Sequence, residues 1–184
     1  RSTSSAASDV YKRQVIKKLA STLKSYSYSE IRLPIIEQTE LFKRSVGDET
    51  DIVNKEMFTF DSKSKKSMTL RPEGTAGCMR ASIEQGLLDQ GNQRLFYHGP
   101  MYRYERPQKG RNREFYQFSA EAYGNDTISI ELELIQIAER IISFFKVPDV
   151  SLEINSLGSK EAQDKFSLEL VKFLTPLKDK LDED

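Results

Sequence analysis

Charged side chains gather in one short part of this chain. Between residues 102 and 113 there are five basic residues and one acidic residue, a local charge of +4, whereas the 184-residue chain has 28 basic and 28 acidic residues and no net charge. These residues are Arg103, Glu105, Arg106, Lys109, Arg111 and Arg113. A neutral chain is not expected to coat nucleic acid or an anionic membrane. The local cluster is therefore where we expect phosphate groups to bind.

The segment after this cluster alternates between polar and apolar side chains. In a β-strand over residues 113–123, one face would carry Arg113, Gln117 and Glu121, and the other would carry mainly apolar residues. A polar face beside a basic loop suits a pocket that binds a zwitterionic small molecule next to an anion. The alternative is a solvated sheet face with paired charges, and the residues alone leave both interpretations open.

A second segment whose residues could bind a ligand is Leu70–Gly77, which reads Leu-Arg-Pro-Glu-Gly-Thr-Ala-Gly. The sequence predicts a strand that breaks at Pro72 and a helix that begins near Thr75. The carboxylate of Glu73 would then lie where it can accept hydrogen bonds from an ammonium group. Alternatively, Thr75 is only a helix N-cap and Gly74 only a tight turn.

One cysteine and one histidine limit the other chemistry. Cys78 cannot form an internal disulfide, and with His98 it cannot make a zinc site, so a reducing, cytosolic setting fits. We interpret His98, at the end of a predicted strand, as a structural residue, with a catalytic base as the alternative. The sequence has no apolar run near the ~20 residues that span a bilayer, so we expect no membrane embedding.

The spacing of apolar residues predicts the elements that hold these segments. Helices are expected over about 15–27, 41–46, 75–85, 127–145 and 159–174, and strands over about 31–35, 57–60, 68–70, 95–105, 113–123 and 150–154. The strands at 95–105 and 113–123 make a long hairpin. Pro34 cannot donate to a strand ladder, so its strand is expected at a sheet edge or an interface. The fold class is α+β, an antiparallel sheet flanked by helices, in one unit.

Residues 1–14 stand apart from this pattern. They are rich in Ser and Ala, and no helical stripe is visible before Val10. We expect them to be a tail outside the family pattern or a disordered tail, with a flexible natural extension as the alternative.

The two chemical segments carry a resemblance. Leu70–Gly77 and Gly99–Arg111 resemble segments of histidyl-tRNA synthetases, which are class II aminoacyl-tRNA synthetases. The similarity extends from about Val15 to the C-terminus. Within it, Ile31–Pro34 resembles the class II dimer-interface motif, and the strand–loop–strand segment resembles the second class II motif. The resemblance implies a class II catalytic domain over residues 15–184 that is truncated, without the third motif or the anticodon-binding domain.

The resemblance also implies a reaction, with ATP and Mg²⁺ as cofactors. Histidine and ATP would give histidyl-adenylate, and histidine would then pass to the 3′ end of tRNA(His). The family is homodimeric and cytoplasmic, and we expect the same here. Because a complete enzyme extends well past residue 184, the isolated chain is expected to have little or no aminoacylation activity.

Residue roles follow by position in the resemblance. Arg103 would be the catalytic residue and would bind the α-phosphate of ATP. In the loop, Arg106 and Gln108 would contact the acceptor end of the tRNA. The alternative is that this loop is only a solvated turn. No metal ligand among the side chains is implied. The residues expected to bind histidine are Glu73, Gly74, Thr75, Gln117 and Glu121, and those expected to bind ATP are Arg103, Glu105, Arg111 and Arg113.

Two rival functions remain open from the sequence. The regulatory subunit of ATP phosphoribosyltransferase shares this fold and binds histidine as an effector without charging tRNA. A non-catalytic dimerisation module is the second rival, supported by Pro34 at a strand edge. The presence of Arg103, Arg111, Gln117 and Glu121 together favours the enzyme.

Overall fold

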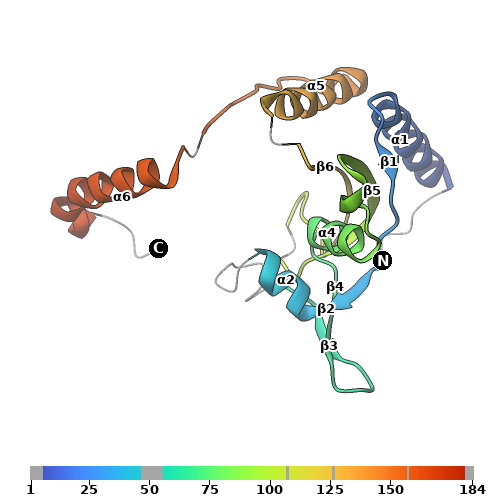
Figure 1. Ribbon diagram of the computed structural model, residues 1–184, viewed down its shortest axis with the longest axis horizontal. Helices are drawn as coiled ribbons and strands as arrows, with labels where there is room; N and C mark the ends of the chain where they lie inside the picture. The colour runs from blue at the N-terminus through green and yellow to red at the C-terminus, as the bar shows by residue number, and fades with distance from the viewer. Residues whose placement is uncertain (1–5, 47–55, 107, 126, 157, 181–184) are drawn as a thin grey trace. The chain divides into compact units, whose positions relative to one another are not determined.

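The computed structural model describes residues 6–46, 56–106, 108–125, 127–156 and 158–180. The chain divides into two compact units, residues 1–146 and 147–184, and not into the one unit expected from the sequence. Figure 1 labels their elements. Among the described residues, no helix has the length and hydropathy needed to cross a bilayer.

The larger unit contains two three-stranded sheets. In the first, the order is β1 (Ser29–Glu30), β5 (Gln93–Tyr102) and β6 (Glu114–Tyr123), with β1 parallel and β6 antiparallel to β5. In the second, the order is β2 (Ile36–Gln38), β4 (Ser67–Leu70) and β3 (Thr59–Asp61), all antiparallel. The predicted long hairpin is thus β5–β6, paired from Gln93↔Tyr123 to Tyr102↔Glu114.

Helices pack on both faces of the β5–β6 hairpin. Phe96 of β5 clusters with Leu23 of α1 (Ala6–Ser25) and Ile137 of α5 (Ile128–Phe145). On the other face, Tyr97 of β5 clusters with Cys78 of α4 (Thr75–Glu84). Adjacent strand residues point to opposite faces, which is why neighbours in sequence enter different clusters. The face of β6 that carries Glu121 is therefore partly covered by α4, and it is not a freely solvated surface.

The remaining helical elements flank the second sheet or follow the hairpin in sequence. Helix α2 (Thr39–Val46) follows β2 directly, and a 3-10 turn, η1 (Leu88–Gln90), follows α4. In the smaller unit, α6 (Lys160–Leu174) leads into η2 (Thr175–Lys180). The hydroxyl of Ser159 accepts a hydrogen bond from the Ala162 amide at 3.2 Å, which is a typical N-cap and marks the start of α6.

Three sequence expectations about these elements were wrong. Residues 31–34 are irregular, because Pro34 lies in the link between two edge strands, β1 and β2. Residues 150–156 form no strand, and their alternating Val150, Leu152 and Ile154 are exposed. Helix α1 begins at Ala6, whereas a helix start near Val15 was expected. The domain boundaries themselves stay a prediction.

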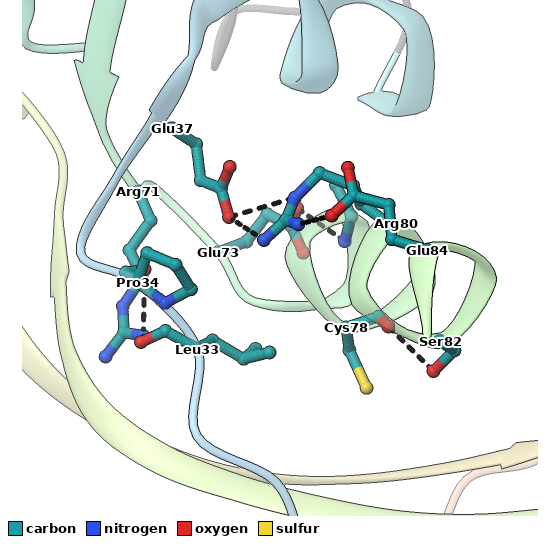
Figure 2. A network of polar contacts seen from close by, with 10 residues as sticks. Leu33, Pro34, Glu37, Arg71, Glu73, Cys78, Arg80, Ser82 and Glu84 are labelled. Carbon is teal, nitrogen blue, oxygen red and sulfur yellow. Dashed lines mark hydrogen bonds and ion pairs between the residues drawn. The ribbon is translucent and has the colours of Figure 1, made fainter. Parts of the chain in front are cut away.

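A buried arginine joins the link region to both sheets. Arg71, 4% exposed, donates from Nε to the carbonyl of Pro100 and from Nη1 to the carbonyls of Leu33 and Pro34, at 2.9, 2.9 and 3.3 Å. Figure 2 shows its side chain pointing at Leu33 and Pro34. Burial lowers the pKa of Arg71, although a guanidinium remains protonated in proteins.

Arg71 also explains a glycine in β5. A Cβ at Gly99 would lie 2.2 Å from Nη2 of Arg71, so only a residue without a side chain fits there. The Arg71 side chain therefore holds the start of the Leu70–Gly77 segment against the main chain of the hairpin.

Candidate functional site

The turn before α4 is organised by a carboxylate. Both oxygens of Glu73 accept hydrogen bonds from backbone amides, one from Thr75 and one from Ala76 at 3.0 Å. These amides are among those that a helix leaves unpaired at its start, and the helix dipole favours a negative charge there. The expected N-cap alternative for Thr75 is wrong, because Gly74 is the N-cap and Glu73 supplies the capping bonds. Each carboxylate oxygen keeps a lone pair for another donor.

Thr75 is directed instead towards β6. Its hydroxyl donates to Oε1 of Glu121 at 2.8 Å, and the hydroxyl of Tyr97 donates to the same oxygen at 3.0 Å. Helix α4 and both strands of the hairpin thus meet at one carboxylate. Burial raises the pKa of Tyr97 above its ordinary value, so its hydroxyl stays protonated and able to donate at neutral pH.

Gln117 lies on the same face of β6, two residues along from the pair Tyr97↔Ser119. It pairs with Gly99, and its Oε1 is buried without a hydrogen-bond partner among the described residues. A buried amide oxygen that lacks a donor costs free energy, and a ligand ammonium would satisfy it. Gln117 and Glu121 therefore form a polar floor beside the start of α4.

Arg103 connects this floor to the basic loop. It follows the end of β5, where its amide donates to the carbonyl of Arg113 at 3.0 Å. Its Nε donates to the carbonyl of Pro72 at 3.0 Å, and its guanidinium lies 5.1 Å from the centre of the Phe115 ring. Since an arginine has five N–H donors, the others remain for an anion.

A cavity of about 440 Å³ opens beside Arg103. It is lined by Glu56, Arg103, Glu105, Gly110, Arg111, Asn112 and Phe115. Across it, Nη1 of Arg111 lies 3.7 Å from Oε2 of Glu105. Three of the four residues expected to bind ATP are therefore brought together around one hollow with a polar lining.

The other loop residues lie outside this cavity. The guanidinium of Arg113 stacks on the ring of Tyr104 at 3.9 Å, and its Nε donates to the carbonyl of Glu105 at 3.4 Å. The side chains of Arg106 and Gln108 are exposed. A tight turn joins Gln108 to Arg111 through two backbone hydrogen bonds of 3.3 and 2.9 Å. The roles expected for these three residues stay predictions.

His98 lies on the opposite face of the hairpin. Its ring stacks on Phe118 at 5.9 Å, and its Nε2 lies 3.6 Å from Oε1 of Glu30. This position is away from Glu121 and fits the structural interpretation of His98. The alternative of a solvated face with paired charges is also disfavoured, because Glu121 has hydroxyl partners and Arg103 has a carbonyl partner.

A second, wider hollow of about 780 Å³ lies between α2 and α4. Its Arg80 contacts Glu37 at 2.6 Å and also Glu84, as Figure 2 shows. None of the residues expected to bind histidine or ATP lines this hollow, so we place the candidate site at the smaller cavity and the adjoining floor.

Sequence reasoning missed three residues of the site. Glu56 lines the cavity, and its carbonyl accepts from the amide of Tyr104 at 2.7 Å, but nothing in its local sequence indicates this. Arg71 belongs to the Leu70–Gly77 segment, but the sequence does not indicate its hydrogen bonds to Leu33, Pro34 and Pro100. Tyr97 could have been found by counting the hairpin register, which sets it opposite Ser119 and so next to Glu121.

No group of three or more metal-ligating side chains occurs within the described ranges. Two carboxylates, Glu56 and Glu105, do line the cavity. Mg²⁺ is commonly held by one or two carboxylates together with substrate phosphates and water, so this donor set fits such an ion when a triphosphate is present.

Comparison with known proteins points to one family. A family model described as histidyl-tRNA synthetase matches residues 7–160. A histidine--tRNA ligase of Alkalilimnicola ehrlichii is 49% identical over 166 residues, which cover 90% of this chain and 39% of that protein. The chain thus spans about two fifths of this relative's length.

Two solved structures are also similar. An apo histidyl-tRNA synthetase of S. aureus matches with a TM-score of 0.77 and 32% identity, covering 100% of this chain and 43% of that chain. An ATP phosphoribosyltransferase regulatory subunit/histidyl-tRNA synthetase from Bacillus halodurans C matches with a TM-score of 0.65 and 22% identity, over 78% of this chain and 36% of that chain, which is a likeness of fold alone.

Proposed function

The chain belongs to the histidyl-tRNA synthetase family, and we propose that it supplies the part of a histidine--tRNA ligase that holds histidine against the α-phosphate of ATP. In the first step, a carboxylate oxygen of histidine attacks the α-phosphorus. The bond from that phosphorus to the bridging oxygen of the β-phosphate breaks, and pyrophosphate leaves. In the second step, a hydroxyl of the terminal ribose of tRNA(His) attacks the carbonyl of histidyl-adenylate, and AMP leaves.

The observation that carries this proposal is a contact that joins the two parts of the site. Arg103 borders the cavity and also binds the carbonyl of Pro72, the residue directly before Glu73. A phosphate bound by Arg103 would therefore lie beside an amino acid bound at the start of α4. Holding two reactants in this way lowers the barrier, and a guanidinium offsets the charge that develops on the phosphate.

The amino acid would be recognised by the polar floor. The α-ammonium group would donate to Glu73 and to Oε1 of Gln117, which has no partner among the described residues, with the main chain at Gly74 and the Thr75 hydroxyl nearby. Glu121 would accept from an imidazole N–H, which selects histidine over isosteres that lack this donor. Arg111 and Glu105 would orient the triphosphate, and Arg113 would add charge at the rim.

Mg²⁺ is a further part of the proposal. When bound, it would screen the β- and γ-phosphates, and Glu56 and Glu105 are the carboxylates available to hold it. Arg106 and Gln108, exposed on the loop, would contact the tRNA acceptor end. Homodimerisation and a cytoplasmic location, expected from the family, also stay predictions.

The test uses a hybrid ligase. The full 184-residue chain replaces the aligned part of the Alkalilimnicola ehrlichii ligase, and histidine-dependent exchange of labelled pyrophosphate into ATP is measured. We expect exchange with histidine and none with other amino acids, and the 184-residue chain alone should give little. A folded hybrid with no histidine-dependent exchange would contradict the proposal.

The same measurement separates the rival functions. A histidine-sensing regulatory subunit or a dimerisation module would bind histidine or a second copy without catalysing exchange. The likeness to the regulatory subunit from Bacillus halodurans C concerns the fold alone, so it gives this rival little support.

A further inference from the structure

Tyr97 is a buried residue that contacts both elements of the proposed histidine site. It lies in β5 with 2% of its surface exposed, and its ring packs against Cys78 and Met101. Its hydroxyl reaches out of this cluster to Oε1 of Glu121 at 3.0 Å, with the Thr75 hydroxyl 3.4 Å away.

The ring of Tyr97 also supports the turn that presents Glu73 and Thr75. A Cβ at Gly74 would lie 2.1 Å from Cε2 of Tyr97 and 2.6 Å from Cζ, too close for any side chain. The main chain at Gly74 therefore rests directly on the ring. This contact gives Gly74 a packing reason in addition to its place in the turn.

Two hydroxyl donors on one oxygen fix the direction of the Glu121 carboxylate. Both Tyr97 and Thr75 donate to Oε1, and none of the described residues donates to Oε2. A carboxylate on a flexible side chain would otherwise rotate about its terminal torsion, which is broad. With Oε1 held, Oε2 is the oxygen left to accept from a ligand.

We propose that Tyr97 is a positioning residue for histidine recognition, which holds Glu121 so that Oε2 faces the imidazole N–H of the substrate. This inference rests on the proposed function. The buried hydroxyl acts through Glu121, and it contacts neither ATP nor the reacting phosphate. Its loss should therefore affect binding of histidine and leave use of ATP nearly unchanged.

Tyr97→Phe in the hybrid ligase is the direct test, because it keeps the ring under Gly74 and removes only the hydroxyl. Because a hydrogen bond to a charged group is lost, we expect KM for histidine to rise by roughly 10-fold or more. The KM for ATP and kcat should change by less than about threefold. An unchanged KM for histidine, or equal changes in both KM values, would overturn the inference.

Tyr123→Phe provides the matched control. Tyr123 lies on the same face of the β5–β6 hairpin as Tyr97. Its buried hydroxyl has no oxygen or nitrogen partner among the described residues, and it lies beside the thiol of Cys78. This substitution removes the same atom from a comparable environment, and we expect KM for histidine to stay within about twofold. A rise equal to that of Tyr97→Phe would mean that any buried hydroxyl has this effect, and the inference would fail.

A double-mutant cycle tests whether Tyr97 acts through Glu121. In a Glu121→Gln background, adding Tyr97→Phe should raise KM for histidine by less than about twofold, because the coupled carboxylate is already gone. If the full effect of Tyr97→Phe persists there, Glu121 is not the intermediary.

Folding is followed by circular dichroism in every variant. A melting temperature that falls by more than about 10 °C in Tyr97→Phe would assign the hydroxyl to stability and also overturn the inference. If the unsubstituted hybrid lacks histidine-dependent exchange, the proposed function itself fails. Normal exchange with an unaffected Tyr97→Phe refutes only the positioning role.

Discussion

The two halves of the candidate site are built in different ways. In the histidine half, made of Glu73, Thr75, Tyr97 and Glu121, the last three sit on regular elements and their side chains bind one another, while Glu73 in the turn binds the first amides of α4. In the ATP half, made of Arg103, Glu105 and Arg111, the groups sit after β5 and on a loop, and Arg111 is 65% exposed. Arg103 is tied to the turn of the histidine half through the carbonyl of Pro72.

This difference indicates where each half gets its geometry. The carboxylate and hydroxyls of the histidine half are held before any ligand arrives, which reduces the entropy lost on binding. In the ATP half Arg103 is also held, by the carbonyl of Pro72, but the side chain of Arg111 is largely solvated, so a triphosphate would have to order it. Specificity is therefore expected to depend on the histidine half, and charge neutralisation on the more solvated ATP half. The following predictions test this division.

The largest effect is expected at the residue that joins the two halves. Arg103→Ala should lower histidine-dependent pyrophosphate exchange in the hybrid ligase by two orders of magnitude or more, about 3 kcal/mol of barrier, because a preorganised donor to the α-phosphate is lost. Arg103→Lys should retain only part of this exchange, since lysine keeps the positive charge without the planar guanidinium.

Lys109→Ala is the control for Arg103, because it removes one positive charge from the same exposed loop without touching the cavity lining. Exchange should stay within about threefold of the unsubstituted hybrid at physiological salt. Comparable losses of exchange in both variants would mean that only the net charge of the loop matters. Arg103 would then not be the residue that joins the two halves.

The next effect concerns the support beneath both halves. Arg71→Met should lower the free energy of unfolding by about 2 kcal/mol in urea denaturation, because three main-chain carbonyls lose a buried donor while the cost of burying a charge is relieved. Arg32→Met is the comparison, since its 93% exposed side chain contacts Glu30 only at 3.7 Å. It should change stability by less than about 0.5 kcal/mol. Equal stability of the two variants would contradict a structural role for Arg71.

A pH dependence should come from the histidine half. Burial raises the pKa of both Tyr97 and Tyr123 in the folded chain, whereas tyrosines of the unfolded chain titrate near pH 10. Their contribution to stability is thus complete below about pH 10 and is lost as pH rises above it, since only the unfolded state releases these protons. Urea midpoints between about pH 9 and 11 should fall with rising pH. A Tyr97→Phe, Tyr123→Phe double variant should show a shallower fall, and an identical slope would contradict the assignment.

The smallest effect is expected at the rim of the ATP half. Arg111→Ala removes an ion pair of 3.7 Å whose arginine is 65% exposed, so stability should change by less than about 0.5 kcal/mol. KM for ATP should rise by roughly threefold and KM for histidine should not change. The KM increase should diminish at high salt. A large rise in KM for histidine would show that the halves are not separate.

Much of this arrangement follows from local sequence. The β5–β6 hairpin, α4, α5 and α6 were predicted within a few residues because their apolar periodicity is strong and their ends carry turn signals. The family-specific segments also indicated both halves of the site. In contrast, Val150, Leu152 and Ile154 alternate as a strand would, yet they are irregular, because alternation specifies a strand only where a partner strand is available.

The contacts between segments distant in sequence could not be predicted in this way. The bond from Thr75 to Glu121 spans 46 positions, and the contact of Gly74 with the Tyr97 ring depends on how α4 packs on the hairpin. Likewise, Glu73 was expected to face a ligand, and its capping bonds to α4 are set by the course of the turn. Residue type limits such contacts, but packing decides them.

The hydrogen bonds of Arg71 have a consequence for how freely this protein can change. All of its side-chain bonds go to main-chain carbonyls, those of Leu33, Pro34 and Pro100. Every amino acid presents the same carbonyl group, so these bonds fix the main-chain path at Leu33, Pro34 and Pro100 without requiring a particular residue type there. Substitution at these positions could therefore alter the surfaces they carry while the junction itself persists, provided that Arg71 and Gly99 are kept.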